Sequence, residues 1–295
     1  MVSYSGRVVV VTGGTRGIGR EIAATFAGAG AQVVVCARTE PCGKLPFHFI
    51  QADLREPEQA TAVIEETVRV YGRVDALVNN AGGSPSADAA TVSPRFVAKV
   101  VALNLLAPFY VAQQANAVMQ QQYNGGVILN IGSVAAHQPQ PRSAAYAAAK
   151  AGLLTLTRAL ALEWAPRVRV NHITVGPVGS SYDPAVSRVI PMGRTADPAD
   201  VAAACLYLAS PQAAYLTGAD LPVHGGGEFP ARYIAAHPLA LSSGAPYLAA
   251  HRDPRVGEAL GRVVHVGDDG ADPAPRGAEV QSVHFFILVL SASSR

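Results

Sequence analysis

Short apolar runs rich in valine and isoleucine alternate with helix-like segments along most of this chain. A parallel pair of strands needs a crossover of a dozen or more residues, usually a helix. The alternation therefore predicts an α/β fold: a single parallel, doubly wound sheet with helices on both faces, in three layers. The strand-like runs are residues 7–12, 32–37, 47–54, 74–78, 127–131, 167–175 and 219–223. The segments with helical spacing are residues 21–30, 56–71, 93–122, 144–164 and 198–209.

Two places depart from a regular alternation. Residues 39–46 are too few for a helical crossover, and Pro41 and Gly43 indicate a turn there. The long segment 93–122 should break near residues 105–108, and a kink at that point would free backbone groups of Asn104 to hold a water molecule.

Glycine and polar residues gather where the strand-like runs end. A glycine-rich turn at residues 13–19 separates the first strand from its helix, which lets backbone N–H groups approach a pyrophosphate. An ordinary tight turn has the same composition, so this pattern alone is ambiguous. Ligands of doubly wound sheets bind at the carboxyl ends of the strands, and several candidate residues share that edge. They are the glycine turn, Arg38, Asn80, Ser133 and Gly176.

The end of the second strand bears on the choice of cofactor. An acidic residue there would hydrogen-bond the ribose 2′-hydroxyl of NAD(H), but the chain has Ala37 and Arg38. A guanidinium suits a 2′-phosphate, and Arg16 in the glycine turn could add a second positive charge. Two surface arginines in an arginine-rich chain are the alternative explanation. We expect NADP(H) to be favoured, with NAD(H) still possible.

Tyr146 and Lys150 are the candidate proton-transfer pair. Residues four apart lie on the same face of a helix, so the Lys150 ammonium should sit close to the Tyr146 phenol. A nearby positive charge favours the phenolate and lowers the pKa of a tyrosine toward neutrality, as a general acid or base requires. The same spacing occurs by chance on solvated helix faces, so its meaning depends on the surrounding residues.

Composition excludes several other functions. The net charge of +2 and the absence of a Lys/Arg cluster argue against nucleic-acid binding. Cys36, Cys42 and Cys205 form no disulfide framework or paired metal-ligand motif, and we expect Cys36 and Cys205 to be small buried hydrophobes. With no apolar run of about 18 residues and no secretory signal pattern, we expect no membrane span, no metal and a cytoplasmic location.

The pattern changes after the last strand-like run. We expect residues 1–230 to form the catalytic domain and residues 231–295 to form an extension, irregular or partly disordered and without a catalytic role. This extension is rich in Pro, Gly, Ala and Ser and shows no helical or strand period.

Over about residues 5–230 the chain resembles the short-chain dehydrogenase/reductase family, whose fold is Rossmann-like. The resemblance implies hydride transfer between a nicotinamide cofactor and a small-molecule carbonyl or alcohol. The motifs that carry it, in the family's order, are TGGTRGIG at residues 12–19, Asp53, NNAG at residues 79–82, Asn104, Ser133, Tyr146 and Lys150.

The family's residue roles transfer to the matching positions. The resemblance implies that Tyr146 is the general acid or base, that Ser133 hydrogen-bonds the substrate oxygen, and that Asn104 orders a proton-relay water. It also implies that Lys150 binds the nicotinamide ribose and lowers the pKa of Tyr146. The remaining cofactor contacts implied are Gly13, Arg16, Gly17, Ile18, Gly19, Asp53, Leu54, Asn80, Gly176 and Ser180, the last in place of the usual threonine.

Some segments also resemble a narrower actinobacterial group linked to steroid ring fragments, some of them CoA thioesters. The resemblance lies in RTEP, NNAGGSP, LNLLAP and the ending VHGGGEFPA. A short segment at residues 181–192 suggests a truncated lid, and His224 is expected to be structural. The family also implies a homodimer or homotetramer formed through the helices at residues 93–122 and 144–164.

Two alternatives remain open at this stage. One is a 3-oxoacyl-thioester reductase of fatty-acid or polyketide type, with the same catalytic residues and a linear substrate. The other is a non-catalytic nucleotide-binding sensor on the same fold, which would be expected to lose Tyr146, Lys150 or Ser133; all three are present.

Overall fold

The computed structural model describes residues 2–138, 140–179 and 184–227 of the 295-residue chain. In this part of the chain seven strands form one parallel sheet in the order β3-β2-β1-β4-β5-β6-β7, which confirms the predicted doubly wound α/β fold. The order reverses between β1 and β4, where doubly wound sheets bind their ligands. The strands are β1 Val8–Thr12, β2 Gln32–Ala37, β3 His48–Gln51, β4 Ala76–Asn79, β5 Gly126–Ile131, β6 Val168–Val175 and β7 Asp220–Val223.

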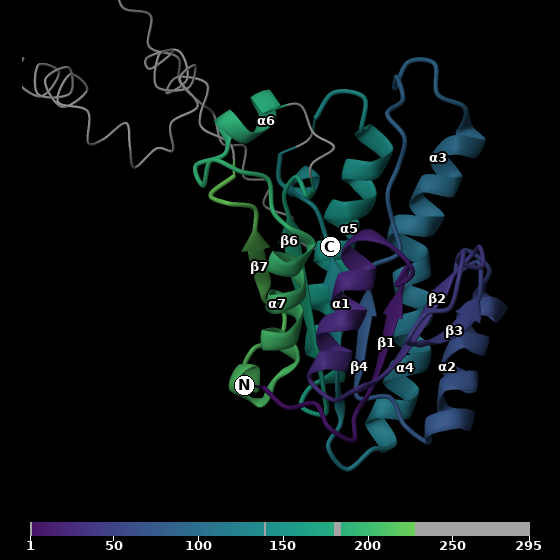
Figure 1. Cartoon of the computed structure of the whole chain (residues 1–295). Helices are drawn as coiled ribbons and strands as arrows, with labels where there is room; N and C mark the ends of the chain where they lie inside the picture. Colours follow the sequence, from purple (N-terminus) through teal and green to yellow (C-terminus); the bar gives the residue numbers. More distant parts are fainter. Residues whose placement is uncertain (1, 139, 180–183, 228–295) are drawn as a thin grey trace, which may run out of the picture. The chain divides into compact units, whose positions relative to one another are not determined.

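Helices cover both faces of the sheet (Figure 1). α1 and α7 pack on one face, while α2, α4 and α5 pack on the other. The helical elements are α1 Gly17–Gly28, α2 Pro57–Tyr71, α3 Pro94–Val101, the π-helical turn η1 Ala102–Leu106, α4 Ala107–Gln121, the short 3₁₀ turn η2 Val134–Ala136, α5 Ala144–Trp164, α6 Pro184–Val189, α7 Pro198–Ala209 and the 3₁₀ turn η3 Pro211–Ala213.

The central strand β1 is apolar from Val8 to Val11 because both of its faces are covered. Along β1, Val9 and Val11 pack with Phe26 of α1, whereas Val10 between them packs with Val111 of α4 on the opposite face. Side chains of a strand point alternately to the two faces, so an uninterrupted valine run suits a parallel strand inside three layers.

The connection between β2 and β3 contains no helix, as its length predicts. The third strand is shorter than expected, spanning His48–Gln51 rather than residues 47–54. The two buried cysteines, Cys36 and Cys205, pack in the core as predicted, and burial raises the pKa of the Cys36 thiol to about 12.

The break in the long helical segment differs from the predicted kink. It begins three residues earlier, at Ala102, and takes the form of η1, in which the Ala107 N–H donates to the Ala102 carbonyl. Pro108 lacks an N–H, so it cannot donate to the Asn104 carbonyl four residues before it. The change in winding places the Asn104 side chain in the interior, fully buried.

The helical run Pro94–Met119 is long and apolar enough to cross a membrane, with a mean hydropathy of 1.5 over its best window. Ala107, Val111 and Ala115 of this run pack onto the sheet, as the side chains of a core helix do. A core helix can meet the same criteria of length and composition as a membrane-spanning helix. Ser180 and the predicted extension at residues 231–295 lie outside the described residues.

Candidate active site

Two adjoining clefts open at the carboxyl edge of the sheet, one of about 830 Å³ and one of about 650 Å³. They share Ile18, Asn80 and Gly82, so a single continuous site crosses the switch point between β1 and β4. Of the residues predicted for the site, the larger cleft is lined by Gly13, Arg16, Gly17, Ile18, Gly19, Arg38, Asp53, Leu54 and Asn80. The smaller is lined by Ile18, Asn80, Ser133, Tyr146, Lys150 and Gly176.

The glycine-rich turn allows α1 to approach the sheet closely. Gly13 has a φ of +66°, which L side chains rarely adopt, and a Cβ atom at Gly19 would collide with the Gly13 carbonyl. The Gly13 N–H donates to the Cys36 carbonyl of β2 at 2.8 Å. The turn therefore leaves an open, side-chain-free floor at the start of α1, as a bound diphosphate requires.

Thr12 ties the turn to the neighbouring strand. Its hydroxyl oxygen accepts hydrogen bonds from the backbone N–H groups of Asn80 and Ala81, both at 3.0 Å. The Asn80 side-chain amide donates back to the Thr12 carbonyl at 3.0 Å. The sequence analysis named Thr12 as the first residue of the TGGTRGIG motif but assigned no role to its hydroxyl.

The outer part of the larger cleft carries excess positive charge. Arg16, Arg20, Arg38, Lys44 and Arg55 line it, with Glu40 and Asp53 as the lining acids among the described residues. Asp53 is ion-paired with Arg55, whose hydrogen bond lowers the pKa of the Asp53 carboxyl. The Asp53 charge is thus neutralised locally, and the cleft fits a phosphate-bearing nucleotide.

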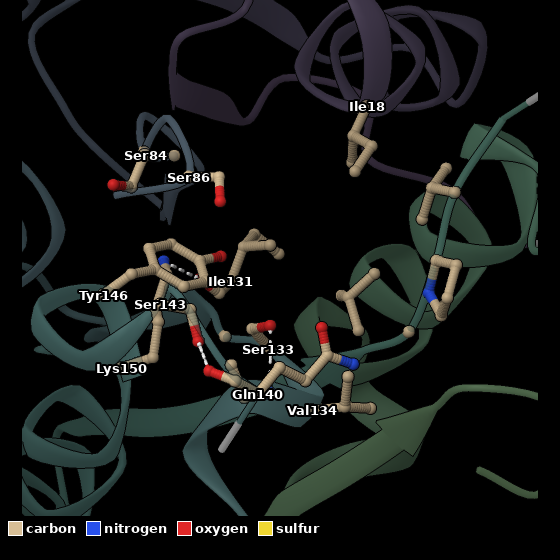
Figure 2. Close-up of a pocket in the computed structure, with 18 of the residues that line it drawn as sticks. Ile18, Ser84, Ser86, Ile131, Ser133, Val134, Gln140, Ser143, Tyr146 and Lys150 are labelled. Carbon is tan, nitrogen blue, oxygen red and sulfur yellow. Dashed lines mark hydrogen bonds between the residues drawn. The ribbon is translucent and has the colours of Figure 1, made fainter. Parts of the chain in front are cut away.

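Tyr146 and Lys150 meet on one wall of the smaller cleft (Figure 2). The Lys150 Nζ lies 5.8 Å from the centroid of the Tyr146 ring, one helical turn along α5. Lys150 is buried, and its Nζ donates to the Ile131 carbonyl at 2.8 Å. Burial lowers the pKa of Lys150 to about 8, so the ammonium form still predominates at neutral pH.

Ser133 lies at the end of β5 and faces the same cleft (Figure 2). Its hydroxyl oxygen accepts a hydrogen bond from the Ala135 N–H at 3.2 Å, which caps the short turn η2. This bond uses a lone pair, and the hydroxyl proton can still be donated to a substrate oxygen.

A family model described as enoyl-(acyl carrier protein) reductase matches residues 13–228, which include both clefts. The chain belongs to the short-chain dehydrogenase/reductase family. It is therefore an oxidoreductase that acts on alcohol groups with a nicotinamide cofactor, NAD(H) or NADP(H).

Individual members of the family cover most of the chain. L-fucose dehydrogenase of Bos taurus is 35% identical over 247 residues, 76% of this chain and 90% of the relative. 3beta-hydroxysteroid dehydrogenase 1 of Eggerthella lenta is 36% identical over 243 residues, 75% of this chain and 93% of the relative. The ligand-free structure of an aldohexose dehydrogenase from Thermoplasma acidophilum superposes with a TM-score of 0.72 at 29% identity, covering 77% and 96% of the two chains.

Buried polar side chains fix the register of α5 on the sheet of this dehydrogenase. The Asn79 amide donates to the Asn130 side-chain oxygen at 2.9 Å, and the Asn130 amide donates to the Thr157 hydroxyl at 2.9 Å. These bonds run from β4 through β5 to α5, the helix that carries Tyr146. Each group is paired, which makes burial tolerable and holds the helix in one position.

Asn104 lies behind the Tyr146–Lys150 wall and holds the loop that follows β4. Its side-chain oxygen accepts from the Gly83 N–H at 2.8 Å, and its amide donates to the Gly83 and Val100 carbonyls, both at 2.9 Å. A Cβ atom at Gly82 would lie 2.9 Å from the Asn104 oxygen and 3.3 Å from the Lys150 Nζ. Because these bonds occupy its side chain, a relay water would bind the Asn104 backbone carbonyl instead.

A second group of titratable residues lies behind Ser133, and sequence reasoning missed it. Asp220 receives hydrogen bonds from His172 at 2.7 Å, from Thr174 at 2.7 Å and from His137 at 2.9 Å. Burial would raise the pKa of Asp220, but these hydrogen bonds outweigh it and lower the pKa to about 2. The group ties the loop after Ser133 to β6 and β7. The contacts join residues 48 and 83 positions apart, so no local spacing reveals them.

Loops that follow β4 and β5 line the smaller cleft, with residues 82–86 and 140–143. Pro177, Val178, Val186 and Val189 form an apolar side of the cleft.

Proposed function

We propose that this dehydrogenase interconverts a ketone and a secondary alcohol, with Tyr146 as the general acid or base. The observation that carries the proposal is the meeting of Tyr146, Lys150 and Ser133 in the smaller cleft, which adjoins the larger one. A non-catalytic sensor would have no need for these three side chains in one place.

Each side chain has a distinct task. Ser133 donates a hydrogen bond to the substrate oxygen, which orients it and disperses its developing charge. Tyr146 gives its proton to that oxygen in reduction and takes it from the hydroxyl in oxidation. The Lys150 ammonium stabilises the phenolate form of Tyr146 and hydrogen-bonds the nicotinamide ribose. The Asn104 carbonyl holds the water that returns the proton. When bound, the cofactor supplies or accepts the hydride.

The assay is the change in 340-nm absorbance of NADPH and NADH against a panel of cyclic ketones and alcohols. Replacing Tyr146 by Phe removes the proton donor and keeps the ring, so we expect kcat to fall by about 10² to 10⁴. Binding of the cofactor, followed by fluorescence titration, should change little. Full turnover by Tyr146→Phe would rule out the proposed proton transfer.

We further propose a preference for NADP(H). Arg16 and Arg38 line the cleft at the end where the adenosine ribose would lie. Asp53, which follows β3 and lines the same cleft, is paired with Arg55. Ser180 stays a predicted cofactor contact.

The cofactor preference can be reversed at one position. Arg38→Asp should raise the KM for NADPH by about tenfold or more, because the carboxylate repels a 2′-phosphate and accepts from a 2′-hydroxyl. The KM for NADH should stay constant or fall. Arg167→Asp is the matched control, since Arg167 is exposed beside the start of β6, at the opposite edge of the sheet. Equal weakening of both cofactors by Arg38→Asp would contradict the proposed 2′-phosphate contact.

For the substrate, we favour a bulky cyclic compound of the steroid-derived kind. The apolar side of the smaller cleft, formed by Pro177, Val178, Val186 and Val189, suits a fused hydrocarbon ring. The hydroxysteroid dehydrogenase relative supports the same class. A linear 3-oxoacyl thioester is the second candidate, because the description of the matching family model names a reductase of another carrier-bound acyl group. Comparing a bicyclic ketone with an acetoacetyl thioester separates the two.

We also propose a cytoplasmic homodimer or homotetramer. Leu106 next to α4 and Leu162 on α5 are exposed large hydrophobic residues, 37% and 85% accessible. They lie on the two helices through which oligomerisation was expected, and a partner subunit would cover them.

A further inference from the structure

The charge of the substrate cleft is one-sided. Among the described residues that line it, Lys150 and Arg142 are the charged ones, and there is no Asp or Glu. Lys150 is buried and hydrogen-bonded to the Ile131 carbonyl. Arg142 is exposed, so it is the cation that a ligand in this cleft can reach.

The backbone of Arg142 is held in an uncommon conformation. Its φ is +65°, the one positive φ at a residue other than glycine in the described part of the chain. Such residues persist where the surroundings fix them, often at ligand-binding positions. Here the Arg142 carbonyl accepts from the Ala87 N–H at 2.9 Å, and both the N–H and the hydroxyl of Ser143 bond to the Gln140 carbonyl.

The side chain of Arg142 spans two loops of the cleft. Its Nε donates to the Ser86 hydroxyl at 3.0 Å, and Ser86 belongs to the loop that follows β4. Within the described residues the two terminal nitrogens, Nη1 and Nη2, have no hydrogen-bond or ion-pair partner. The guanidinium is thus oriented through Nε, while its terminal pair of donors stays available for two oxygens of an oxyanion.

We propose that Arg142 binds an anionic group of the substrate, which makes the substrate an oxyanion-bearing ketone or alcohol. The inference rests on the proposed ketone–alcohol interconversion and adds the charge of its substrate. The oxyanion can be a carboxylate of the substrate itself or a phosphate of a carrier that is thioester-linked to it. Arg142 is exposed and Tyr146 is half-buried, so the anion binds at the mouth of the cleft and the reacting carbon lies deeper.

Two substrate pairs test the charge and identify its source. The first is a decalone carboxylic acid and its methyl ester. The second is acetoacetyl-coenzyme A and the N-acetylcysteamine thioester of acetoacetate. For the pair that carries the relevant anion, we expect the charged member to have a kcat/KM about tenfold higher, mainly through KM, because a hydrogen bond to a charged group is worth about that factor. A preference within the first pair assigns a carboxylate, and one within the second assigns a carrier phosphate.

The variants separate binding from a structural role. Arg142→Asn removes the guanidinium but tolerates the positive φ, since asparagine enters this region readily. It should bring the charged-to-neutral ratio close to one, while Arg142→Lys retains part of the preference. Arg167→Asn is the control and should keep the wild-type ratio, because Arg167 is exposed at the opposite edge of the sheet. A merely structural Arg142 would lower kcat/KM equally for both members of a pair.

Two results would overturn the inference: equal use of both members of each pair by the wild type, or an unchanged ratio in Arg142→Asn. The ratio is independent of the amount of folded enzyme, so partial unfolding of a variant does not imitate loss of the anion contact. Turnover of ketones without charge preference leaves the proposed function intact, whereas no turnover of any carbonyl compound with either cofactor contradicts the function itself.

Discussion

At the scale of single residues, Lys150 illustrates how a functional charge is kept in the interior. The ammonium is removed from water and compensated in the described structure by the Ile131 carbonyl and the face of the Tyr146 ring. Its pKa falls from 10.5 to about 8 because burial disfavours the charged form. The residue therefore costs stability at neutral pH, and its retention fits a catalytic use.

This cost predicts a pH dependence of stability. Between pH 8 and 10.5 the unfolded chain holds a proton on Lys150 that the folded chain has lost, so the free energy of unfolding rises with pH in that window. The free energy of unfolding of the wild type minus that of Lys150→Met should rise by up to about 3 kcal/mol across this window. Below the window this difference should stay constant.

Urea unfolding at pH 7, 8, 9 and 10 measures this gain. Both proteins are compared in a Tyr146→Phe background, which removes the coupled titration of that phenol, while the other titrating groups cancel in the difference. Parallel stability curves for the two proteins would show that the pKa of Lys150 is not lowered by burial.

Residue-scale prediction from sequence succeeded where the contact is local. The four-residue spacing is enough to bring Tyr146 and Lys150 together on one helix face. It could not reveal His172 and Asp220, which meet across β6 and β7 at a separation of 48 residues. His172 also lies fully buried in the middle of β6, and the sequence pattern of that strand does not distinguish it from a core residue.

At the scale of elements, the π-helical turn η1 places Asn104 so that one side chain holds a whole loop. The Asn104 side chain accepts a hydrogen bond from the Gly83 N–H and donates to the Gly83 and Val100 carbonyls. The sequence indicated an interruption of this helix because of Pro108, but it did not predict the form. A π-turn and a proline kink arise from the same residues, and packing of Asn104 against the loop after β4 selects between them.

Asn104→Ala should lower the free energy of unfolding by about 1–3 kcal/mol, because it leaves buried partners unpaired. It should also speed hydrogen exchange at the Gly83 amide, which loses its acceptor. Asn116→Ala is the control: this asparagine on α4 accepts one bond from the Gln120 side chain and touches no part of the loop. Unchanged exchange at Gly83 would mean that the loop is held by other contacts.

At the scale of the whole molecule, the alternation of strands and helices was enough to predict the sheet, its winding and the edge where the site lies. The crossover rule leaves few alternatives once uninterrupted apolar strands are recognised. The shape of the substrate cleft could not be predicted in the same way. It depends on contacts between loops such as Arg142 with Ser86, which are 56 residues apart and have no periodic pattern.

The wall shared by the two clefts has a practical consequence for ligand discovery. Ile18, Asn80 and Gly82 line both cavities, so a nucleotide seated in one completes the surface of the other. Occupancy of either cavity then changes affinity in its neighbour, and this thermodynamic coupling is reciprocal. Thermal-shift screens for the substrate should therefore be run with saturating NAD⁺ and with saturating NADP⁺, because without a bound nucleotide even the true substrate meets an incomplete surface.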